Sequence, residues 1–402
     1  MNMTLDEQIN IIKETVTPVG TERVLLEDAP FRILAEDITA KEDVPPFRRS
    51  PLDAYAMRSE DIKNASKESP VVLKVLEEVA AGQVPKYEIT AGTASRVMTG
   101  APVPEGSDCV IRYEETEFTD EKVKIFKPLK AGENIILPGE DIKKGEVLAK
   151  AGTVIDAGLC GTLSGQNIDR PLVYKKSVIG IIPTGSELVK PGNELPAGKI
   201  YDSNSFTLNA VIRKLGCVPR QYEIAGDEVE RIAASIEQAL EECDAVILTG
   251  GVSVGDFDYT PAAMEKAGAE ILFKAAKIKP GMSCAYGKKD GKLICALSGN
   301  PTSSVINFYV IGMPAVKKLT GLKDYDPEEI TAELKAPFRK TGKIPRYICG
   351  KLEFSGDSVK IDVPEKQGNV ILSSMIGCRA LVVIPPSDKP LPAGAKVKAF
   401  LI

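Results

Sequence analysis

The stretch DAVILTGGVSVGDFDYT, residues 244–260, joins a short apolar run to a glycine-rich loop. The run DAVILT has the length and composition of a β-strand that is buried on both faces, as the strands of parallel sheets are. The paired Gly250 and Gly251, followed by Ser253 and Gly255, let the main chain approach a ligand closely and turn several N–H groups towards it. This stretch therefore predicts a buried strand that ends in a ligand-binding loop.

On both sides of this stretch, strand-like runs alternate with helical ones and short loops. The alternation predicts βαβ units and a mainly parallel sheet with helices on both faces, a three-layer α/β/α domain. We predict strands at SVIGII (177–182), CVPRQYEIA (217–225), DAVILT (244–249) and KLICAL (292–297), helices over 203–215 and 227–242, and a further helix after Gly299.

The chain of 402 residues is longer than one hydrophobic core usually supports, so several domains are expected. A helix is predicted over residues 4–16, where Thr4 and Glu7 have the spacing of a capping box, and a second short helix is predicted near 28–35. Short β-like runs between Gly and Pro turns predict two further β-domains. The predicted division is a mixed N-terminal domain (1–42 and 141–175), a β-rich inserted domain (43–140), the α/β domain (176–322) and a small C-terminal β-barrel-like domain (323–402).

Composition excludes several classes of protein. The net charge of −5, with acidic and basic residues interspersed, argues against a nucleic-acid partner. The N-terminus lacks the pattern of a signal peptide, and the apolar runs are too short to cross a membrane. The eight cysteines show no CxxC spacing, which indicates reduced and mostly buried thiols. We therefore expect a cytoplasmic protein.

The chain contains no histidine. This excludes Ser-His triads and zinc sites with histidine ligands. The remaining ligands for a metal are carboxylate, carbonyl and hydroxyl oxygens, which suit Mg²⁺ or a similarly hard cation.

Three predicted strands end in loops rich in Gly, Thr and Ser: PTGSEL (183–188), GGVSVGDFDYT (250–260) and SGNPTSS (298–304). Because the carboxyl ends of parallel strands share one edge of a sheet, these loops are expected to converge. Asp256 and Asp258 could hold a metal that neutralises a phosphate bound by the loop amides. The alternative is an ordinary turn in which Asp258 or Thr260 caps the next helix.

Other residues near the strand ends each have a functional and a structural interpretation. The helix after Gly299 would offer free N–H groups near residues 302–304 to an anion, or Ser298 or Asn300 would simply cap it. Glu187 and Asp227 could be acidic metal ligands, although Asp227 also has the spacing of a capping box with Glu230. Lys279, in KIKPG, could contact an anion or lie in a solvated basic loop.

Taken together, the segments SPLDAYAM (50–57), MTGAPVP (98–104), PTGSEL, GGVSVGDFDYT, KPG and SGNP resemble, in this order and at these separations, the molybdopterin molybdenumtransferase family. These are the bacterial molybdenum insertases related to the C-terminal part of gephyrin. The resemblance covers essentially the whole chain. It implies an enzyme that inserts molybdate into adenylylated molybdopterin with Mg²⁺-assisted hydrolysis, and that releases AMP and the finished molybdenum cofactor.

The resemblance also implies an elongated homodimer, in which the α/β domain of one subunit faces the β-rich insert of the other. The implied protein partners are the molybdopterin adenylyltransferase and apo-molybdoenzymes. The implied metal ligands are Glu187, Asp227, Asp256 and Asp258. Functional positions of the family pattern match Asp53, Thr99, Glu187, Asp227, Asp258 and Lys279. Ligand-cradling positions match Gly250, Gly251, Ser253, Gly255, Gly299, Asn300, Pro301 and Ser303, and Arg346 and Ser373 are expected to face the same cleft.

The chain departs from the family pattern at several positions. Ala54 stands where glycine is common, SGNPTS replaces PGNPVS, and PGMS replaces PGKP, so that Met282 takes the place of a lysine. Two other functions stay open at this point. An adenylyltransferase of the same pathway would share the α/β domain, and a non-catalytic pterin-binding scaffold would share the whole architecture.

Overall fold

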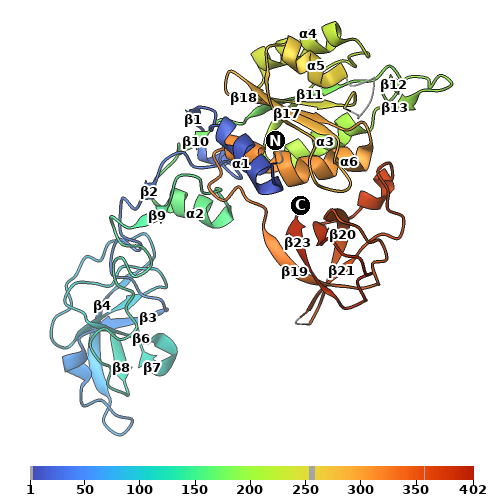
Figure 1. Cartoon of the computed structure of the whole chain (residues 1–402). Helices are drawn as coiled ribbons and strands as arrows, with labels where there is room; N and C mark the ends of the chain where they lie inside the picture. Colours follow the sequence, from blue (N-terminus) through green and yellow to red (C-terminus); the bar gives the residue numbers. More distant parts are fainter. Residues whose placement is uncertain (1–2, 253–258, 357) are drawn as a thin grey trace. The chain divides into compact units, whose positions relative to one another are not determined.

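The computed structural model of the chain describes residues 3–252, 259–356 and 358–402. The chain forms two compact units (Figure 1). The first comprises Met1–Glu36, Ala151–Cys160 and Arg170–Ile402, and the second comprises Asp37–Lys150 and Gly161–Asp169. The four-part division made from the sequence stays a prediction.

The first unit is built on a mixed sheet whose described strands follow the order β14-β11-β15-β18-β17-β16. The first four of these strands are mutually parallel, and β17 runs antiparallel to both of its neighbours. The predicted strands are confirmed, whereas β16 and β17 were not predicted. The strands are β11 (Val178–Pro183), β14 (Val218–Gln221), β15 (Ala245–Thr249), β16 (Glu270–Lys274), β17 (Cys284–Lys289) and β18 (Lys292–Leu297).

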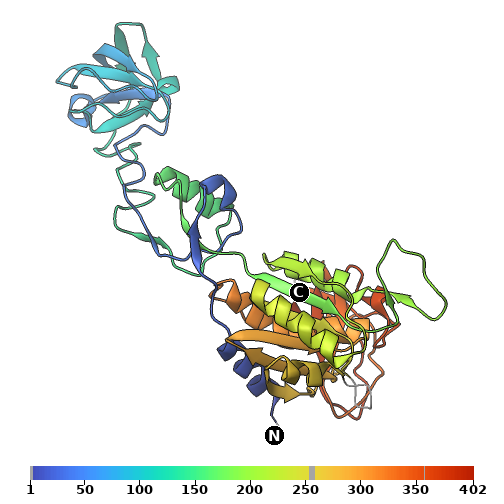
Figure 2. The same cartoon turned by 90° about the horizontal axis from the view of Figure 1, so that it is seen from above.

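Helices cover both faces of this sheet, as the predicted three-layer α/β/α architecture requires (Figures 1 and 2). Apolar side chains of α1, α3, α6 and α7 pack on one face, and those of α4 and α5 pack on the other. Strand β15 is buried along its whole length, which explains its continuous apolar sequence. The helices are α1 (Leu5–Thr15), α3 (Asn204–Lys214), α4 (Val229–Glu242), α5 (Tyr259–Lys266), α6 (Pro301–Asn307) and α7 (Met313–Leu319), with a π-helical turn η4 (Phe308–Gly312) between the last two.

The C-terminal part of the same unit closes into a barrel in the order β19-β21-β20-β22-β23. This confirms the predicted barrel-like domain. Its core contains inward-facing apolar residues such as Ile348, Ile361 and Val382. The strands are β19 (Glu329–Leu334), β20 (Arg346–Ser355), β21 (Ser358–Asp362), β22 (Ala380–Ile384) and β23 (Lys396–Leu401), and the 3₁₀ turn η5 (Leu372–Met375) precedes β22.

The N-terminal helix is confirmed, but the second predicted helix is wrong. The Thr4 hydroxyl accepts from the Glu7 N–H at 3.3 Å, and the Glu7 carboxylate accepts from the Thr4 N–H at 2.7 Å, so the capping box forms. Over 28–35 the structure has the end of a 3₁₀ turn, η1 (Leu26–Asp28), then a turn at residues 30–31 and β-bridges at Ile33 and Leu34. Long-range pairing replaces the helix there, because the Phe31 N–H donates to Ile155 O and the Leu34 N–H donates to Thr153 O.

Short two-stranded pairs accompany the larger sheets. In the first unit β1 pairs with β10 and β12 pairs with β13; in the second unit β2 pairs with β9. These strands are β1 (Thr21–Arg23), β2 (Ile38–Thr39), β9 (Val147–Ala149), β10 (Leu172–Tyr174), β12 (Leu188–Val189) and β13 (Ile200–Tyr201). Helix α2 (Ala157–Gly165) lies at the boundary between the two units.

The second unit contains a sheet with described strands in the order β6-β3-β5-β4-β8-β7, with β4 and β5 parallel and the other pairs antiparallel. Strand β3, which has a neighbour on each side, is buried along its length, in line with the low-charge sequence AYAM. The strands are β3 (Ala54–Met57), β4 (Val71–Val79), β5 (Thr93–Val97), β6 (Cys109–Arg112), β7 (Thr116–Phe118) and β8 (Lys122–Ile125), and two 3₁₀ turns, η2 (Ser59–Ile62) and η3 (Tyr113–Glu115), join them.

Most cysteines of the described chain are buried, as their scattered spacing predicted. The cysteines are free thiols, and those at 109, 217, 243, 284, 295 and 349 are buried. Among the helices of the described ranges, none has both the length and the apolar character needed to cross a membrane.

Candidate functional site

The three glycine-rich loops meet at the carboxyl edge of the parallel strands, as predicted. The Thr184 N–H and hydroxyl both donate to the Thr249 carbonyl, at 2.8 and 3.1 Å, and join the loops after β11 and β15. The Gly250 N–H donates to Leu297 O at 2.9 Å, and the position of a Cβ on Gly299 would lie 3.6 Å from the Gly250 Cα. Main-chain contacts therefore fix the three loops against one another.

The loop after β15 requires glycine at its first two positions. Gly250 and Gly251 have φ angles of 102° and 61°, a region that other residues rarely adopt. A Cβ on Gly250 would lie 2.3 Å from Thr184 O, and one on Gly251 would lie 2.5 Å from the Thr260 hydroxyl. Ser253, Gly255, Asp256 and Asp258 lie outside the described residues.

The far end of this loop is held by Thr260, although not in the way the alternative interpretation suggested. Thr260 is inside helix α5, and its buried hydroxyl donates to Gly250 O at 2.9 Å. The Thr260 N–H donates to Gly251 O at 3.2 Å. The threonine thus closes the loop onto its own start and does not cap the helix through its side chain.

Asp227 joins two of the strand-end loops. Its carboxylate accepts from the Ser186 N–H at 2.9 Å, which links the loop after β14 to the PTGSEL loop that carries Glu187. The predicted capping box between Asp227 and Glu230 is wrong: the N-cap of α4 is Glu228, which makes no side-chain capping bond within the described chain. The carboxylate of Asp227 is engaged across the loops and not by its own helix.

These loops surround a first cavity of about 720 Å³, which we call the glycine-loop cavity. Glu187 and Asp227 place two carboxylates in its lining. Within the described residues, no group of three or more Asp, Glu, Cys or His side chains is arranged to hold a metal. The lining comprises Thr184, Gly185, Glu187, Ile200, Asp227, Gly251, Val252, Tyr259, Ser283, Ser298, Gly299, Asn300, Pro301 and Val370.

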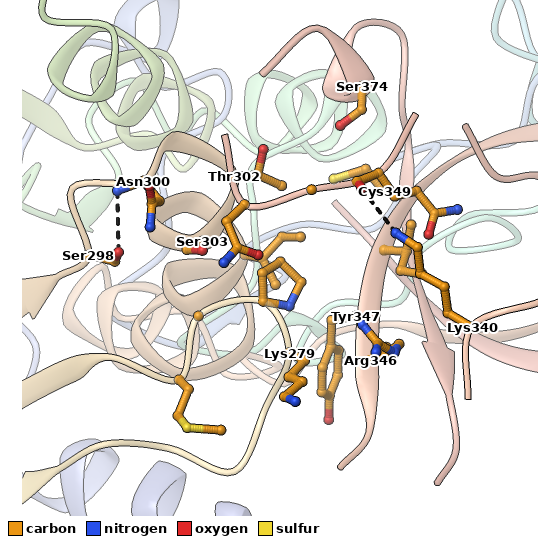
Figure 3. A pocket seen from close by; sticks show the side chains of 18 of the residues that line it. Lys279, Ser298, Asn300, Thr302, Ser303, Lys340, Arg346, Tyr347, Cys349 and Ser374 are labelled. Carbon is orange, nitrogen blue, oxygen red and sulfur yellow. Dashed lines mark hydrogen bonds between the residues drawn. The ribbon is translucent and has the colours of Figure 1, made fainter. Parts of the chain in front are cut away.

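A second cavity of about 390 Å³, which we call the cation cavity, adjoins the first, since Ser283, Ser298 and Asn300 line both. Figure 3 shows it from close by. Of the described residues in its lining, three are cations and none is a carboxylate. The lining includes Lys279, Met282, Ser283, Ser298, Asn300, Thr302, Ser303, Lys340, Arg346, Gln367, Asn369 and Ser374.

The α/β domain and the barrel both build the cation cavity. Lys279 precedes β17, whereas Arg346 begins barrel strand β20, and the two residues form a parallel β-bridge. Arg346 Nε and Thr302 Oγ1 are buried and have no hydrogen-bond partner in the described structure. Unpaired buried donors beside Lys279 suit an anion, which would supply the missing hydrogen bonds.

The SGNP loop forms the boundary between the two cavities. Pro301 is the first residue of α6, and Asn300 precedes it without a side-chain capping bond in the described structure. The Asn204 amide donates to Gly299 O at 2.9 Å and supports the loop from α3. The Thr302 N–H donates to Asn369 O at 3.1 Å, so the predicted free amide at this position is already used.

Several predicted residues lie elsewhere. Asp53 and Thr99 are in the second unit and contact each other: the Thr99 N–H and hydroxyl donate to the Asp53 carboxylate at 2.8 and 3.0 Å. These bonds, the backbone one first, hold the pKa of Asp53 below its ordinary value. Ser373 is exposed and lies in η5, outside the lining of both cavities, whereas its neighbour Ser374 lines the cation cavity.

Sequence reasoning did not find Lys340, Ser283 or Ser374, and it pointed to residue 302 for its N–H group and not for its hydroxyl. No motif surrounds Lys340, and only the folding of the barrel brings it to the cavity. Thr184 lies within the predicted PTGSEL loop, but its role in joining two loops depends on strand pairing.

Comparisons with known proteins find relatives that match nearly the whole chain. A family described as "MoeA N-terminal region (domain I and II)" matches residues 3–166, and one described as "Probable molybdopterin binding domain" matches residues 180–318. A molybdopterin molybdenumtransferase of Staphylococcus epidermidis is 35% identical over 401 residues, which are 99% of this chain and 95% of the relative. The corresponding Bacillus subtilis protein is 35% identical over 404 residues, 99% of this chain and 94% of the relative.

A solved structure has the same fold along its full length. The crystal structure of a molybdopterin biosynthesis moeA protein from Pyrococcus horikoshii superposes with a TM-score of 0.87 at 32% identity. The match covers 100% of both chains.

Proposed function

Because this chain belongs to the molybdopterin molybdenumtransferase family, we propose that its two adjoining cavities hold the two substrates of metal insertion. The chain is an enzyme of molybdenum cofactor biosynthesis. The proposed reaction joins molybdate to adenylylated molybdopterin, hydrolyses the bond between the adenylyl group and the phosphate, and releases AMP. The observation that carries the proposal is that the carboxylate-bearing glycine-loop cavity and the cation cavity share Ser283, Ser298 and Asn300.

The glycine-loop cavity suits the phosphates of the adenylylated pterin. Gly251 and Gly299 leave the main chain exposed to a ligand without side chains in the way. Glu187 and Asp227 alone would repel a pyrophosphate, so a cation is needed between them and the phosphates.

Mg²⁺ fits this set of residues. Its ligands in proteins are oxygens, and it is commonly held by one or two carboxylates together with substrate phosphates and waters. Glu187 and Asp227 are carboxylates lining one cavity, and they would hold the ion there. Bound Mg²⁺ would neutralise the pyrophosphate and polarise the phosphorus under attack. We propose Asp256 and Asp258 as further Mg²⁺ ligands on the ground of the sequence alone.

The cation cavity suits molybdate, a compact dianion. Lys279 and Arg346 would neutralise its charge, and Arg346 Nε and Thr302 Oγ1 would complete their hydrogen bonding on its oxygens. The shared residues Ser283, Ser298 and Asn300 lie where the two substrates would meet. The dithiolene of the pterin supplies sulfur ligands for the metal, so no protein cysteine needs to take part.

The proposal extends to assembly and location. We propose a cytoplasmic homodimer in which Asp53 and Thr99 contribute to the site of the partner subunit. Such an enzyme would receive its substrate from the molybdopterin adenylyltransferase and pass its product to apo-molybdoenzymes.

The direct test is incubation with adenylylated molybdopterin, Mg²⁺ and either molybdate or tungstate. AMP is measured by chromatography, and finished cofactor is measured by activation of an apo-molybdoenzyme. The expected result is AMP release that depends on both Mg²⁺ and the oxyanion. Tight binding of the pterin without AMP release under either oxyanion would contradict insertion and favour a scaffold.

A further inference from the structure

A third cation, Lys340, lies in the lining of the cation cavity together with Lys279 and Arg346 (Figure 3). Lys340 lies in the segment that connects β19 to β20 of the barrel. Arg346 is the first residue of β20. A role for Lys340 in binding the oxyanion rests on the proposed function of this cavity as the oxyanion site.

The segment at residues 364–369 holds Lys340 at the cavity. The Lys340 ammonium donates to Gln367 O at 3.0 Å, and the Gln367 side chain donates to Pro364 O at 2.8 Å. The same segment is tied to helix α6, because Asn369 O accepts from the Thr302 N–H at 3.1 Å. The Lys340 side chain is therefore positioned by a segment that is itself part of the cavity wall.

The Lys340 ammonium has donors left for an anion. An ammonium carries three N–H donors, and one of them is used by Gln367 O in the described structure. The two other cations of the lining, Lys279 and Arg346, would only balance the charge of one dianion. The oxyanion must also approach the negatively charged phosphates of the second substrate, and a third positive charge reduces this repulsion.

Met282, by contrast, lines the same cavity without any charge. It is 38% exposed and precedes Ser283, which both cavities share. A lysine at position 282 would place an ammonium in this cavity from the α/β side, opposite to the barrel side that provides Lys340.

We propose that Lys340 is a direct ligand of the oxyanion and that it sets the affinity of the enzyme for tetrahedral dianions such as molybdate and tungstate. The barrel then supplies two of the three charges that bind this substrate, Lys340 and Arg346. Binding of the adenylylated pterin in the glycine-loop cavity, whose described lining does not include Lys340, is independent of it.

The test compares Lys340→Met with a matched control, Lys343→Met, which removes an exposed lysine of the same segment outside the described lining of the cavity. Removal of one charge-assisted hydrogen bond should raise the KM for molybdate roughly tenfold or more. The kcat at saturating molybdate and the KM for adenylylated molybdopterin should stay at parental values, and Lys343→Met should change none of these constants. An unchanged molybdate KM in Lys340→Met would overturn the proposal.

A rescue variant separates a lost ligand from a general disturbance. Addition of Met282→Lys to Lys340→Met should restore most of the affinity for molybdate, because it returns a positive charge to the same cavity. Failure of this rescue, with both variants folded by circular dichroism, would assign Lys340 a structural role and count against the proposal.

Calorimetric titration with molybdate or tungstate alone keeps this inference separate from the proposed reaction. If the parental protein binds oxyanion but releases no AMP, the proposed function fails, and weaker binding by Lys340→Met still supports the inference. If the parental protein binds neither oxyanion, the assignment of Lys340 as their ligand is wrong.

Discussion

Lys279 and Arg346 are paired through the main chain across the junction between the α/β domain and the barrel. The Tyr347 N–H donates to Lys279 O at 2.8 Å, and the Lys279 N–H donates to Pro345 O at 3.1 Å. Their side chains line the same cavity, but neither is needed for this pairing. Substitutions of the side chains can therefore test ligand binding without separating the domains.

The first prediction concerns Lys279→Met. Because the contact with the barrel uses main-chain atoms, the free energy of unfolding should stay within about 0.5 kcal/mol of the parental value, as is usual for exposed positions. The KM for molybdate in the AMP-release assay should rise on the order of tenfold. The control is Lys277→Met, an exposed lysine outside the described lining. A large loss of stability with an unaltered KM would show that Lys279 is structural.

The second prediction concerns Gly250→Ala. Its Cβ would lie 2.3 Å from Thr184 O, so two strand-end loops must separate. Denaturant unfolding should show a loss of stability beyond the roughly 1–2 kcal/mol that a left-handed φ costs by itself, and AMP release should be abolished. Gly192→Ala is the matched control, since Gly192 has a φ of 97° and open space around its Cβ position. Equal effects of the two substitutions would refute the steric argument.

The third prediction separates the two tasks of Asp227. Asp227→Asn retains an oxygen that can accept from the Ser186 N–H, but it removes the charge that would hold Mg²⁺. The Mg²⁺ concentration for half-maximal AMP release should rise by at least about tenfold, with little change in thermal stability. Asp227→Ala should also lower stability, since the Ser186 N–H loses its partner. Parental Mg²⁺ dependence in Asp227→Asn would exclude this carboxylate as a ligand.

The fourth prediction concerns the Asp53 carboxyl group in the second unit. Thr99→Val removes the hydroxyl donor and keeps the backbone N–H, the larger cause of the lowered pKa. The pKa of Asp53, followed by carbon NMR, should therefore rise part of the way towards its ordinary value of 3.8. Thr99→Ser, which keeps the hydroxyl, should leave the pKa low.

The sign of the pH effect follows from the direction of this shift. A carboxyl group whose pKa is lowered by folding stabilises the fold above its unfolded-state pKa, and the contribution disappears as the pH falls through the folded-state value. Thr99→Val should thus reduce stability slightly at neutral pH and not at a pH well below the folded-state pKa. An equal loss of stability at both pH values would show that Thr99→Val acts through packing and not through the ionised Asp53 carboxylate.

Local pattern was sufficient for the regular elements. Strands β11, β15 and β18 have continuous apolar runs, and α4 has an apolar stripe. These patterns can be read without knowing the partner, because each segment must bury its apolar side chains against some other element. Because parallel strands end at one edge, the meeting of their three loops also followed from sequence. Prediction failed where long-range contacts compete with local preference. The Phe31 and Leu34 N–H groups donate to the carbonyls of residues 155 and 153 and do not form a helix. The Asp227 carboxylate accepts from the Ser186 N–H and does not cap its own helix.

The sequence by itself determined the α/β/α layers, the barrel-like C-terminal domain and the glycine loops, because periodicity and backbone freedom are local properties of the chain. The family resemblance already implied that Arg346 faces the same cleft as these loops. Only the tertiary structure decided that Lys340 shares one cavity with Lys279 and Arg346. Lys340 and Arg346 reach the loops of the α/β domain through closure of the barrel and its main-chain pairing with Lys279. The approach of Lys340 to Lys279 depends on contacts between segments more than sixty residues apart in sequence, and no local signal around Lys340 encodes it.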